Sequence, residues 1–257
     1  MRLSLTLILT LIAFASYGQD TLVACLDEFP PYQMLETPPR GEHVAALDQL
    51  ADELEMELQF VTEPGFSHCI KRIENGTADV IAGILDRAER SHFLHHLPMR
   101  EDTAYIFATR TDAPSINSYA DLSNRLIAVS EGVYYFDKFD NDDSLQKIPL
   151  NDVHHAYKLL LAGRVDTVIS SMENLSAIYA GDPQLKTKIK VQPYSYQLNR
   201  IVYFGLSKKS SHARNIKEFR AIAEKAFNEG KFSTAIHQFA ADNPQYYQVK
   251  PRPVGAQ

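Results

Sequence analysis

Two well-separated stretches of the chain repeat one local plan. Residues 73–84 read IENGTADVIAGI, and residues 160–171 read LLAGRVDTVISS. Each stretch runs from the end of an apolar-striped helix through a glycine to an aspartate, and then into a short strand rich in β-branched residues. Helices that alternate with buried strands are typical of a parallel sheet with helices on its faces. The chain therefore predicts two α/β lobes, each with one such strand in the middle of its sheet.

The residues between helix and strand have defined tasks in this plan. Gly76 and Gly163 suit the left-handed position that follows the end of a helix. Asp79 and Asp166 are expected to accept hydrogen bonds from turn amides at the entry to the strands.

Hydrophobic periodicity extends both units, and the order of elements in the first is strand, helix, strand, helix, strand. Two further helices are expected near the end of the chain. The other expected elements are strands at 21–26, 57–64, 78–84, 104–111, 126–132, 165–171 and 201–209, helices at 43–56, 66–76, 152–163 and 173–182, and a turn with a short helix at 116–125.

The N-terminal sequence MRLSLTLILTLIAFASYGQD is typical of a secretory signal peptide. It has one arginine, a short apolar run and a small-residue exit, and the run is too short for a membrane span. We expect residues 1–18 to be removed, with cleavage after Gly18 favoured over Ala15. The segment LVAC resembles a lipoprotein cleavage box, but Asp20 precedes it, so Cys25 is assigned to the first strand of the mature domain. The mature chain is therefore expected to be exported.

Charge and cysteine content narrow the function classes. A net charge of −6 gives no electrostatic case for binding nucleic acid or an anionic membrane. The two cysteines, Cys25 and Cys69, would lie in an oxidising compartment, where a disulfide between them and two separate buried thiols are both consistent with the sequence.

The ends of the repeated strands locate the functional site. In open parallel sheets the ligand crevice lies beyond the carboxyl ends of the strands. Those ends carry AGILDRAER (82–90) in one lobe and SSMEN (170–174) in the other. If the lobes face each other, these stretches line the cleft between them.

At this point the sequence resembles the family 3 periplasmic solute-binding proteins, the polar-amino-acid receptors of ABC uptake systems. The resemblance covers residues 21–242 and depends on the order and spacing of several motifs together. These motifs are DEFPPYQM after the first strand, IENGTADVIAGI followed by ER, YADLSNRLIAVSEG, LLLAGRVDTVI, and YFGLSKKS before the terminal helices.

The resemblance implies a periplasmic-binding-protein-like α/β fold of two lobes, each a mostly parallel sheet flanked by helices, joined by two crossing segments near 102–105 and 194–200. Lobe 1 would comprise residues 20–102 and 200–245, lobe 2 residues 105–197, and residues 246–257 would form a mobile tail. It also implies a monomer that captures a small solute, an amino acid or related carboxylate, and delivers it to a membrane permease, with no cofactor and no metal.

Arg90 is the residue to which the resemblance gives the clearest role. It lies where the family has the arginine that grips a ligand carboxylate, and a guanidinium can pair both carboxylate oxygens at once. Phe29 and Phe66 match aromatic positions that sandwich the ligand side chain. Gly83 matches a position whose backbone lines the pocket, and Gly132 falls at a turn that faces it.

Departures from the family pattern concern the group that binds the ligand ammonium. The usual hydroxyl two residues after Gly83 is Leu85, the usual threonine after Gly132 is Val133, and the usual aspartate is Ser171. A buried ammonium without a counter-charge would cost several kcal/mol.

Three solutions to this missing charge stay open. Glu131 or Glu173 replaces the aspartate, the ligand has no ammonium, or a larger solute is read by Tyr134 and Tyr135.

Two other functions also fit the scaffold. A cleft enzyme of the cyclohexadienyl dehydratase type would need a carboxyl of raised pKa as its general acid, for which Glu173 or Glu131 is the candidate. A stand-alone sensory protein would pass its signal to a membrane partner. A metal site at His92, His95 and His96 is not favoured, because no cysteine or carboxylate lies at ligand spacing within that run.

Overall fold

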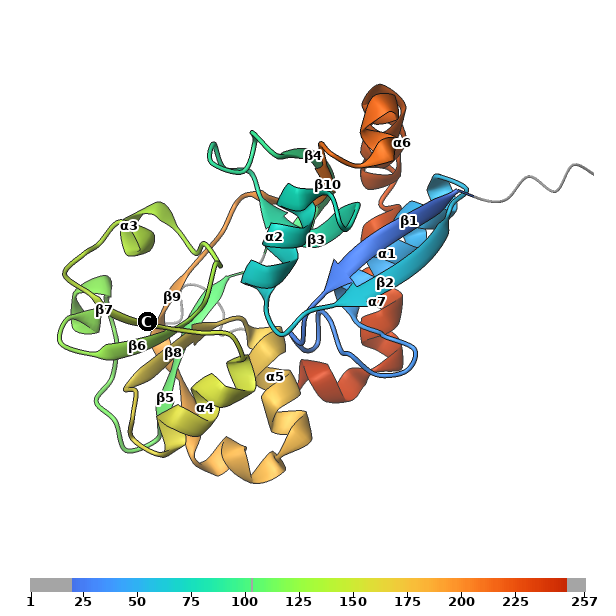
Figure 1. Cartoon of the computed structure of the whole chain (residues 1–257). Helices are drawn as coiled ribbons and strands as arrows, with labels where there is room; N and C mark the ends of the chain where they lie inside the picture. The colour runs from blue at the N-terminus through green and yellow to red at the C-terminus, as the bar shows by residue number, and fades with distance from the viewer. Residues whose placement is uncertain (1–19, 103, 249–257) are drawn as a thin grey trace, which may run out of the picture.

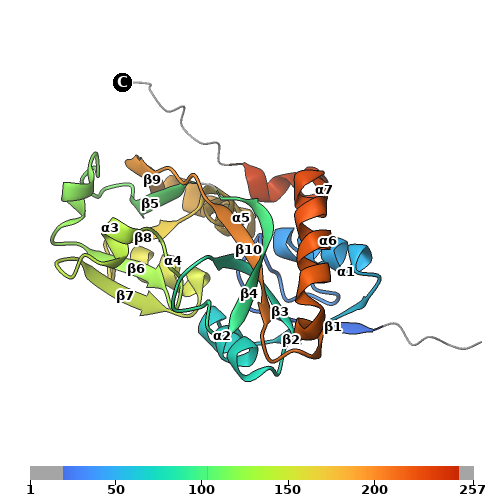
Figure 2. The ribbon, with the colours of Figure 1, turned by 90° about the horizontal axis from the view of Figure 1, so that it is seen from above.

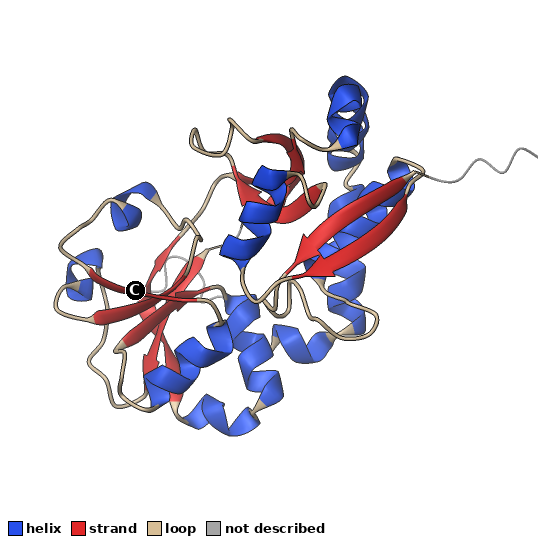
Figure 3. Ribbon diagram, in the orientation of Figure 1, coloured by secondary structure: helices blue, strands red, loops and turns tan. Residues whose placement is uncertain are grey.

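The computed structural model describes residues 20–102 and 104–248. They form two lobes, each built around a five-stranded sheet (Figures 1 and 3). The strand order is β2-β1-β3-β10-β4 in the first sheet and β7-β6-β8-β5-β9 in the second. The expected signal peptide lies outside the described residues. The strands are β1 (Thr21–Leu26), β2 (Glu57–Thr62), β3 (Val80–Leu85), β4 (Leu94–Glu101), β5 (Tyr105–Arg110), β6 (Leu126–Ser130), β7 (Gln146–Leu150), β8 (Thr167–Ser170), β9 (Ile189–Tyr196) and β10 (Ile201–Ser207).

Both sheets have the same arrangement, with three parallel strands extended by an antiparallel strand and an edge strand. β1 pairs in parallel with β2 and β3, whereas β10 is antiparallel to β3 and β4. In the second sheet, β6 pairs in parallel with β7 and β8, and β5 is antiparallel to β8 and β9. The two-lobed, mostly parallel α/β fold is therefore confirmed.

Helices bury both faces of the first sheet. Alternate residues of β1, such as Leu22 and Leu26, belong to a core shared with α1 (Glu42–Glu53), α6 (Ile216–Asn228) and α7 (Lys231–Asp242). Cys25 belongs to the core of the other face with α2 (Phe66–Asn75), and a disulfide to Cys69 joins β1 to this helix with 5.6 Å between the Cα atoms. Figure 2 shows the two lobes beside each other, with α6 and α7 on the side of the first lobe away from the second.

The second lobe is built similarly. Its helices are α3 (Asp137–Asp140), α4 (Val153–Leu161) and α5 (Met172–Gly181), with short 3-10 turns at Tyr119–Leu122 and Pro183–Thr187. Val168 of β8 packs with α4 and α5, and its neighbour Ile169 packs on the opposite face with Phe107 and Phe139.

The repeated glycine and aspartate have matching structural roles in the two lobes. Gly76 and Gly163 adopt φ of 75° and 68°, as expected after helix ends. The aspartates, however, do not bind turn amides. Asp79 Oδ2 accepts from the backbone N–H of Val23 at 2.9 Å, and Asp166 Oδ2 accepts from that of Leu126 at 2.8 Å. Each aspartate therefore fixes the start of its strand to the neighbouring parallel strand, which explains why the unit is repeated.

Three strands were not predicted from the sequence: β4, β7 and β9. β4 contains His95 and His96, and Pro98 fits there because β4 is an edge strand, where an amide is not needed for pairing. Neighbours in a strand point to opposite faces, so the side chains of His95 and His96 do not converge. No metal-binding group of three or more ligands occurs among the described residues.

The two passages between the sheets lie side by side. The chain leaves β4 after Glu101 and returns from β9 after Tyr196, and the backbone N–H of Asp102 donates to the carbonyl of Arg200 at 2.9 Å. These passages connect the two sheets. Within the described residues, no helix has the length and apolar character needed to cross a membrane.

The tail was expected to start at residue 246, but the structure shows that residues 246 and 247 belong to a packed turn. A short 3-10 turn, η4 (Pro244–Tyr247), packs against α5 of the second lobe. Tyr247 donates to Glu42 Oε1 at 2.7 Å, and Arg40 contacts the hydroxyl of Tyr246 at 3.3 Å. These hydrogen bonds of Tyr246 and Tyr247 fix a segment that the composition of the last residues does not predict to be ordered. The end of the expected tail, 249–257, lies outside the described residues.

Candidate functional site

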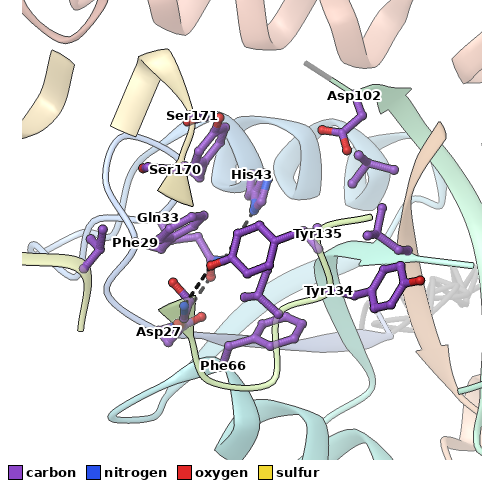
Figure 4. A pocket seen from close by; sticks show the side chains of 18 of the residues that line it. Asp27, Phe29, Gln33, His43, Phe66, Asp102, Tyr134, Tyr135, Ser170 and Ser171 are labelled. Carbon is purple, nitrogen blue, oxygen red and sulfur yellow. Dashed lines mark hydrogen bonds between the residues drawn. The ribbon is translucent and has the colours of Figure 1, made fainter. Parts of the chain in front are cut away.

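A cavity of about 100 Å³ lies between the lobes and is lined from both of them (Figure 4). It is bordered by the end of β1 and the loop after it, the end of β3, the turn after β6, and the end of β8. Most of the residues selected from the sequence line it. They are Phe29, Phe66, Gly83, Leu85, Arg90, Glu131, Val133, Tyr134, Tyr135 and Ser171.

Arg90 enters the cavity from the turn that follows β3. Its backbone N–H donates to the carbonyl of Arg87, and its Nη2 donates across the cleft to the carbonyl of Gly132 at 2.8 Å. The guanidinium carbon lies 5.5 Å from the ring centre of Phe66. Burial lowers the pKa of Arg90, and no carboxylate of the described residues lies within 4.0 Å of its nitrogens. Arg90 is thus a partly enclosed cation with spare hydrogen-bond donors.

Asp27 is the enclosed carboxylate of the cavity, and the sequence interpretation missed it. It follows β1 directly and is only 6% exposed. Burial, with a contribution from Glu28, raises its pKa to about 6, although backbone N–H groups including that of Phe66 oppose the shift. No cationic side chain of the described residues lies within 4.0 Å of it. Its position at the carboxyl end of a central parallel strand is the signal that identifies it.

Asp27 and Arg90 both lie next to Phe66. Asp27 is held near the backbone amide of Phe66 at the start of α2, whereas Arg90 approaches its ring. The cavity therefore presents one uncompensated negative and one uncompensated positive group next to the same aromatic wall. This arrangement matches the charges of a zwitterion.

The expected replacements for the missing aspartate do not lie where an enclosed ammonium would need them. Glu173 does not line the cavity; its Oε2 accepts from the hydroxyl of Tyr32 at 3.2 Å. Glu131 lines the rim and is exposed to solvent. Ser171 begins α5, where its Oγ accepts from the backbone N–H of Asn174 at 3.1 Å and from Tyr32 at 2.8 Å.

Internal contacts already occupy the two tyrosines expected to read a larger solute. The hydroxyl of Tyr135 is buried and accepts from the backbone N–H of Ser130 at 2.8 Å. The ring of Tyr134 lies 3.2 Å from the guanidinium carbon of Arg87, and its hydroxyl donates to Asp137. Both residues line the cavity, but the Tyr134 hydroxyl already donates its proton to Asp137, and the Tyr135 hydroxyl is held as an acceptor by the backbone of Ser130.

Gly83 is needed for a steric reason at this site. Its φ is 84°, which disfavours any side chain, and a Cβ there would lie 2.6 Å from His43 Cε1. Because Gly83 has no side chain, the imidazole of His43 reaches the cavity wall. His43 was not selected from the sequence, and neither were Tyr32, Gln33, Arg100 and Asp102, which also line the cavity.

Direct contacts hold the two lobes together around the cavity. Besides the bonds of Arg90 and Tyr32, Asn174 Nδ2 donates to the carbonyl of Pro30 at 2.7 Å. Arg200 Nη1 donates to the carbonyl of Tyr135 at 2.6 Å near the passages between the sheets. The two lobes are therefore in direct contact, and cavity-lining groups from both lobes lie together.

Comparisons with solved structures identify proteins of the same shape. They include a Streptococcus pneumoniae amino acid ABC transporter substrate-binding protein bound to L-arginine (TM-score 0.71, 18% identity, 90% of this chain and 97% of that chain). A Salmonella typhimurium periplasmic binding protein described as highly specific for arginine aligns with a TM-score of 0.70 and 14% identity over 85% of this chain and 98% of that one. The GluR0 ligand-binding core of Nostoc punctiforme in complex with L-glutamate aligns with a TM-score of 0.67 and 16% identity over 86% of this chain and 98% of that chain.

Sequence comparison identifies the family. No curated protein matches the sequence significantly. The family model described as bacterial extracellular solute-binding proteins, family 3, matches residues 22–239, which is most of the chain. The chain belongs to family 3 of the bacterial extracellular solute-binding proteins.

Proposed function

We propose that this protein captures a small solute with a carboxylate, an amino acid or a close relative, in the cavity between its lobes. The observation that carries the proposal is Arg90, a partly enclosed guanidinium that lines the cavity and has no carboxylate partner within 4.0 Å among the described residues. A bound carboxylate would supply both the counter-charge and two hydrogen-bond acceptors. Membership of a solute-binding family supports the same function.

Asp27 would bind the ammonium of such a ligand. The family position for this task is Ser171, which has no charge and is occupied by Tyr32 and by the start of α5. Asp27 is the better replacement because it is enclosed, lies beside Phe66 and lacks a cation within 4.0 Å in the described chain. A carboxylate in this setting gains interaction energy when a cation arrives.

Closure of the lobes would couple binding to recognition by a partner. Arg90 belongs to the first lobe and donates to Gly132 of the second, so a ligand held by Arg90 lies against both lobes. Only contacts made in the closed state can favour closure. We infer that the closed protein delivers its solute to a membrane permease of the ABC type, acts as a monomer in the periplasm after cleavage near Gly18, and needs no cofactor.

A cleft dehydratase is the competing function, and the two carboxylates first considered for it do not fit. Glu173 lies outside the cavity and Glu131 is exposed. Asp27 has the raised pKa that a general acid needs, and this is the observation that favours a dehydratase. Incubation of the purified protein with prephenate or arogenate should yield no aromatic product. Steady turnover that Asp27→Asn abolishes would favour the enzyme instead.

The proposed function is tested by ligand screening of the mature protein. We expect thermal-shift measurements against the standard amino acids and short organic acids to give at least one stabilising carboxylate. The carboxamide analogue of the same compound should give no shift, because it has no charge to pair with Arg90. The proposal fails if no carboxylate stabilises the protein at millimolar concentration, or if the carboxamide binds equally well.

A further inference from the structure

Four residues of the first lobe form a second polar region of the cavity, which we name the Tyr32 corner. They are Tyr32, Gln33, His43 and Arg100. The rings of Tyr32 and His43 are 5.0 Å apart, and the guanidinium carbon of Arg100 lies 5.5 Å from the Tyr32 ring centre. In Figure 4, His43 and Ser171, the interlobe partner of Tyr32, lie on the opposite side of the pocket from Phe66. The corner thus lies across the pocket from Phe66, and Gln33 links it to the backbone of Asp27.

Hydrogen bonds define which nitrogen of His43 is the donor. The backbone N–H of Asp27 donates to Gln33 Oε1 at 3.3 Å, which fixes the orientation of that amide. Gln33 Nε2 then donates to His43 Nδ1 at 3.3 Å, so the proton of the neutral imidazole lies on Nε2. Burial, reinforced by the nearby charge of Arg100, lowers the pKa of His43 well below its usual value and keeps the ring neutral.

Both His43 and Arg100 have a donor without a partner. His43 Nε2 and Arg100 Nε are buried, and neither has a hydrogen-bond acceptor among the described residues. His43 is only 4% exposed, and the side chain of Arg100 is 12% exposed. Native structures rarely leave buried donors unpaired, because an unpaired donor loses its hydrogen bonds to water without gaining a replacement. The region therefore has two donors that need an acceptor.

The charges around Arg100 indicate what kind of acceptor fits. Asp102 lies 3.6 Å from Arg100 Nη1. Burial by itself would lower the pKa of Arg100, but Tyr32 and the charges of the nearby acids Asp102, Glu42 and Glu173 raise it. The positive charge is already balanced by the protein. A carboxylate on the ligand side chain would be repelled by the three acids next to Arg100. A cation on the ligand side chain would face two N–H donors, which it cannot pair.

We propose that the Tyr32 corner is a subsite for the uncharged oxygen acceptor of the ligand, the carbonyl of a side-chain amide being the best match. The inference rests on the proposed function, since Arg90 and Asp27 would hold the carboxylate and ammonium ends. It assigns the protein to amino acids with a neutral amide side chain. Ligands with an acidic, basic or purely apolar side chain are bound less tightly.

Calorimetry with three ligands of similar shape tests the subsite. L-glutamine, L-glutamate and L-norleucine share the amino acid end and differ at the far end of the side chain. L-asparagine provides the shorter amide. We expect an amide ligand to bind roughly tenfold or more tightly than norleucine, because it pairs donors that norleucine leaves unpaired. Equal affinity for norleucine, tighter binding of glutamate, or no binding of either amide overturns the proposal.

A variant isolates the contribution of His43. His43→Phe keeps a planar ring against Gly83 but removes the Nε2 donor, so the preference for amide over norleucine should fall severalfold while norleucine affinity changes little. The ratio within one variant is insensitive to a general loss of stability. His155→Phe, a change on helix α4 away from the cavity, is the control and should keep the wild-type ratio. An unchanged ratio in His43→Phe refutes the subsite.

Failure of the subsite is distinguishable from failure of the proposed function. If a different carboxylate binds in an Arg90-dependent manner and neither amide does, the receptor function stands and the Tyr32 corner is not an amide subsite. If no carboxylate binds at all, both inferences fall together.

Discussion

We predict that the buried, ionised side chain of Asp27 lowers the stability of the ligand-free protein, because the position is built to bind a ligand cation. Burial raises the pKa of Asp27 from its ordinary 3.8 to about 6, and the residue is 6% exposed. At about 1.4 kcal/mol per unit of pKa, keeping this group ionised costs the folded state about 3 kcal/mol above pH 6. The folded state binds the proton more tightly than the unfolded chain does. The cost is therefore relieved as the pH falls from about 6 towards 4.

Replacing Asp27 by asparagine removes the charge while keeping nearly the same shape. We expect Asp27→Asn to raise the unfolding free energy of the ligand-free protein by about 1–3 kcal/mol at pH 8, which is several degrees in Tm. The gain should shrink as the pH falls below 6 and vanish near pH 4. Denaturant unfolding across this pH range measures it, with Asp143→Asn, at an exposed position, as the matched control.

The same variant should lose ligand affinity. A ligand with an ammonium should bind Asp27→Asn at least tenfold more weakly, while its des-amino analogue should bind both proteins with similar affinity. The reasoning is refuted if the variant is no more stable than the wild type at pH 8. It is equally refuted if the stability difference does not depend on pH, or if ammonium and des-amino ligands lose affinity alike.

Three further predictions concern stability and closure. Removing the Cys25–Cys69 disulfide by a double serine substitution should cost about 4 kcal/mol, because the bridge closes a loop of 44 residues; denaturation with and without reductant measures this. Tyr32→Phe removes the interlobe bond to Ser171 and should speed ligand release roughly threefold to tenfold in stopped-flow measurements, with Tm nearly unchanged. Glu42 is buried and its pKa is raised to about 7, so wild-type stability should fall as the pH rises from 5 to 8. Glu42→Gln should reduce this fall by about 1–3 kcal/mol, as measured by denaturant titrations at each pH.

Local signals in the sequence predicted the central strands of both sheets and the helices that precede them. Gly76 and Gly163 end helices as expected, and the apolar strands after them lie in the middle of the two sheets. β4 was not predicted because its histidines and Pro98 are not typical of a strand. The strand is stabilised by pairing with β10, which is distant in sequence. Strands of this kind depend on tertiary pairing, which local propensity does not encode.

The candidate site was only partly predictable. Arg90 lies in the cavity because a charged segment directly follows a central strand, and that position can be read from the sequence. His43 reaches the cavity only because Gly83, on another element, leaves room for its ring. Tyr134 and Tyr135 looked like ligand contacts, but their hydroxyls bind Asp137 and the backbone of Ser130. Which polar groups stay free for a ligand depends on such pairings, which only the folded chain defines.

The role of Arg90 is tested most directly by one calorimetric comparison. The dissociation constant of the tightest carboxylate from the screen is measured with the wild type, with Arg90→Gln, and with Arg164→Gln as an exposed control. Loss of one partner of an enclosed charge pair costs about 2–5 kcal/mol, so Arg90→Gln should weaken binding by roughly thirtyfold or more while Arg164→Gln has no effect. Equal affinity of the Arg90→Gln variant and the wild type would contradict the assignment of Arg90 as the carboxylate anchor.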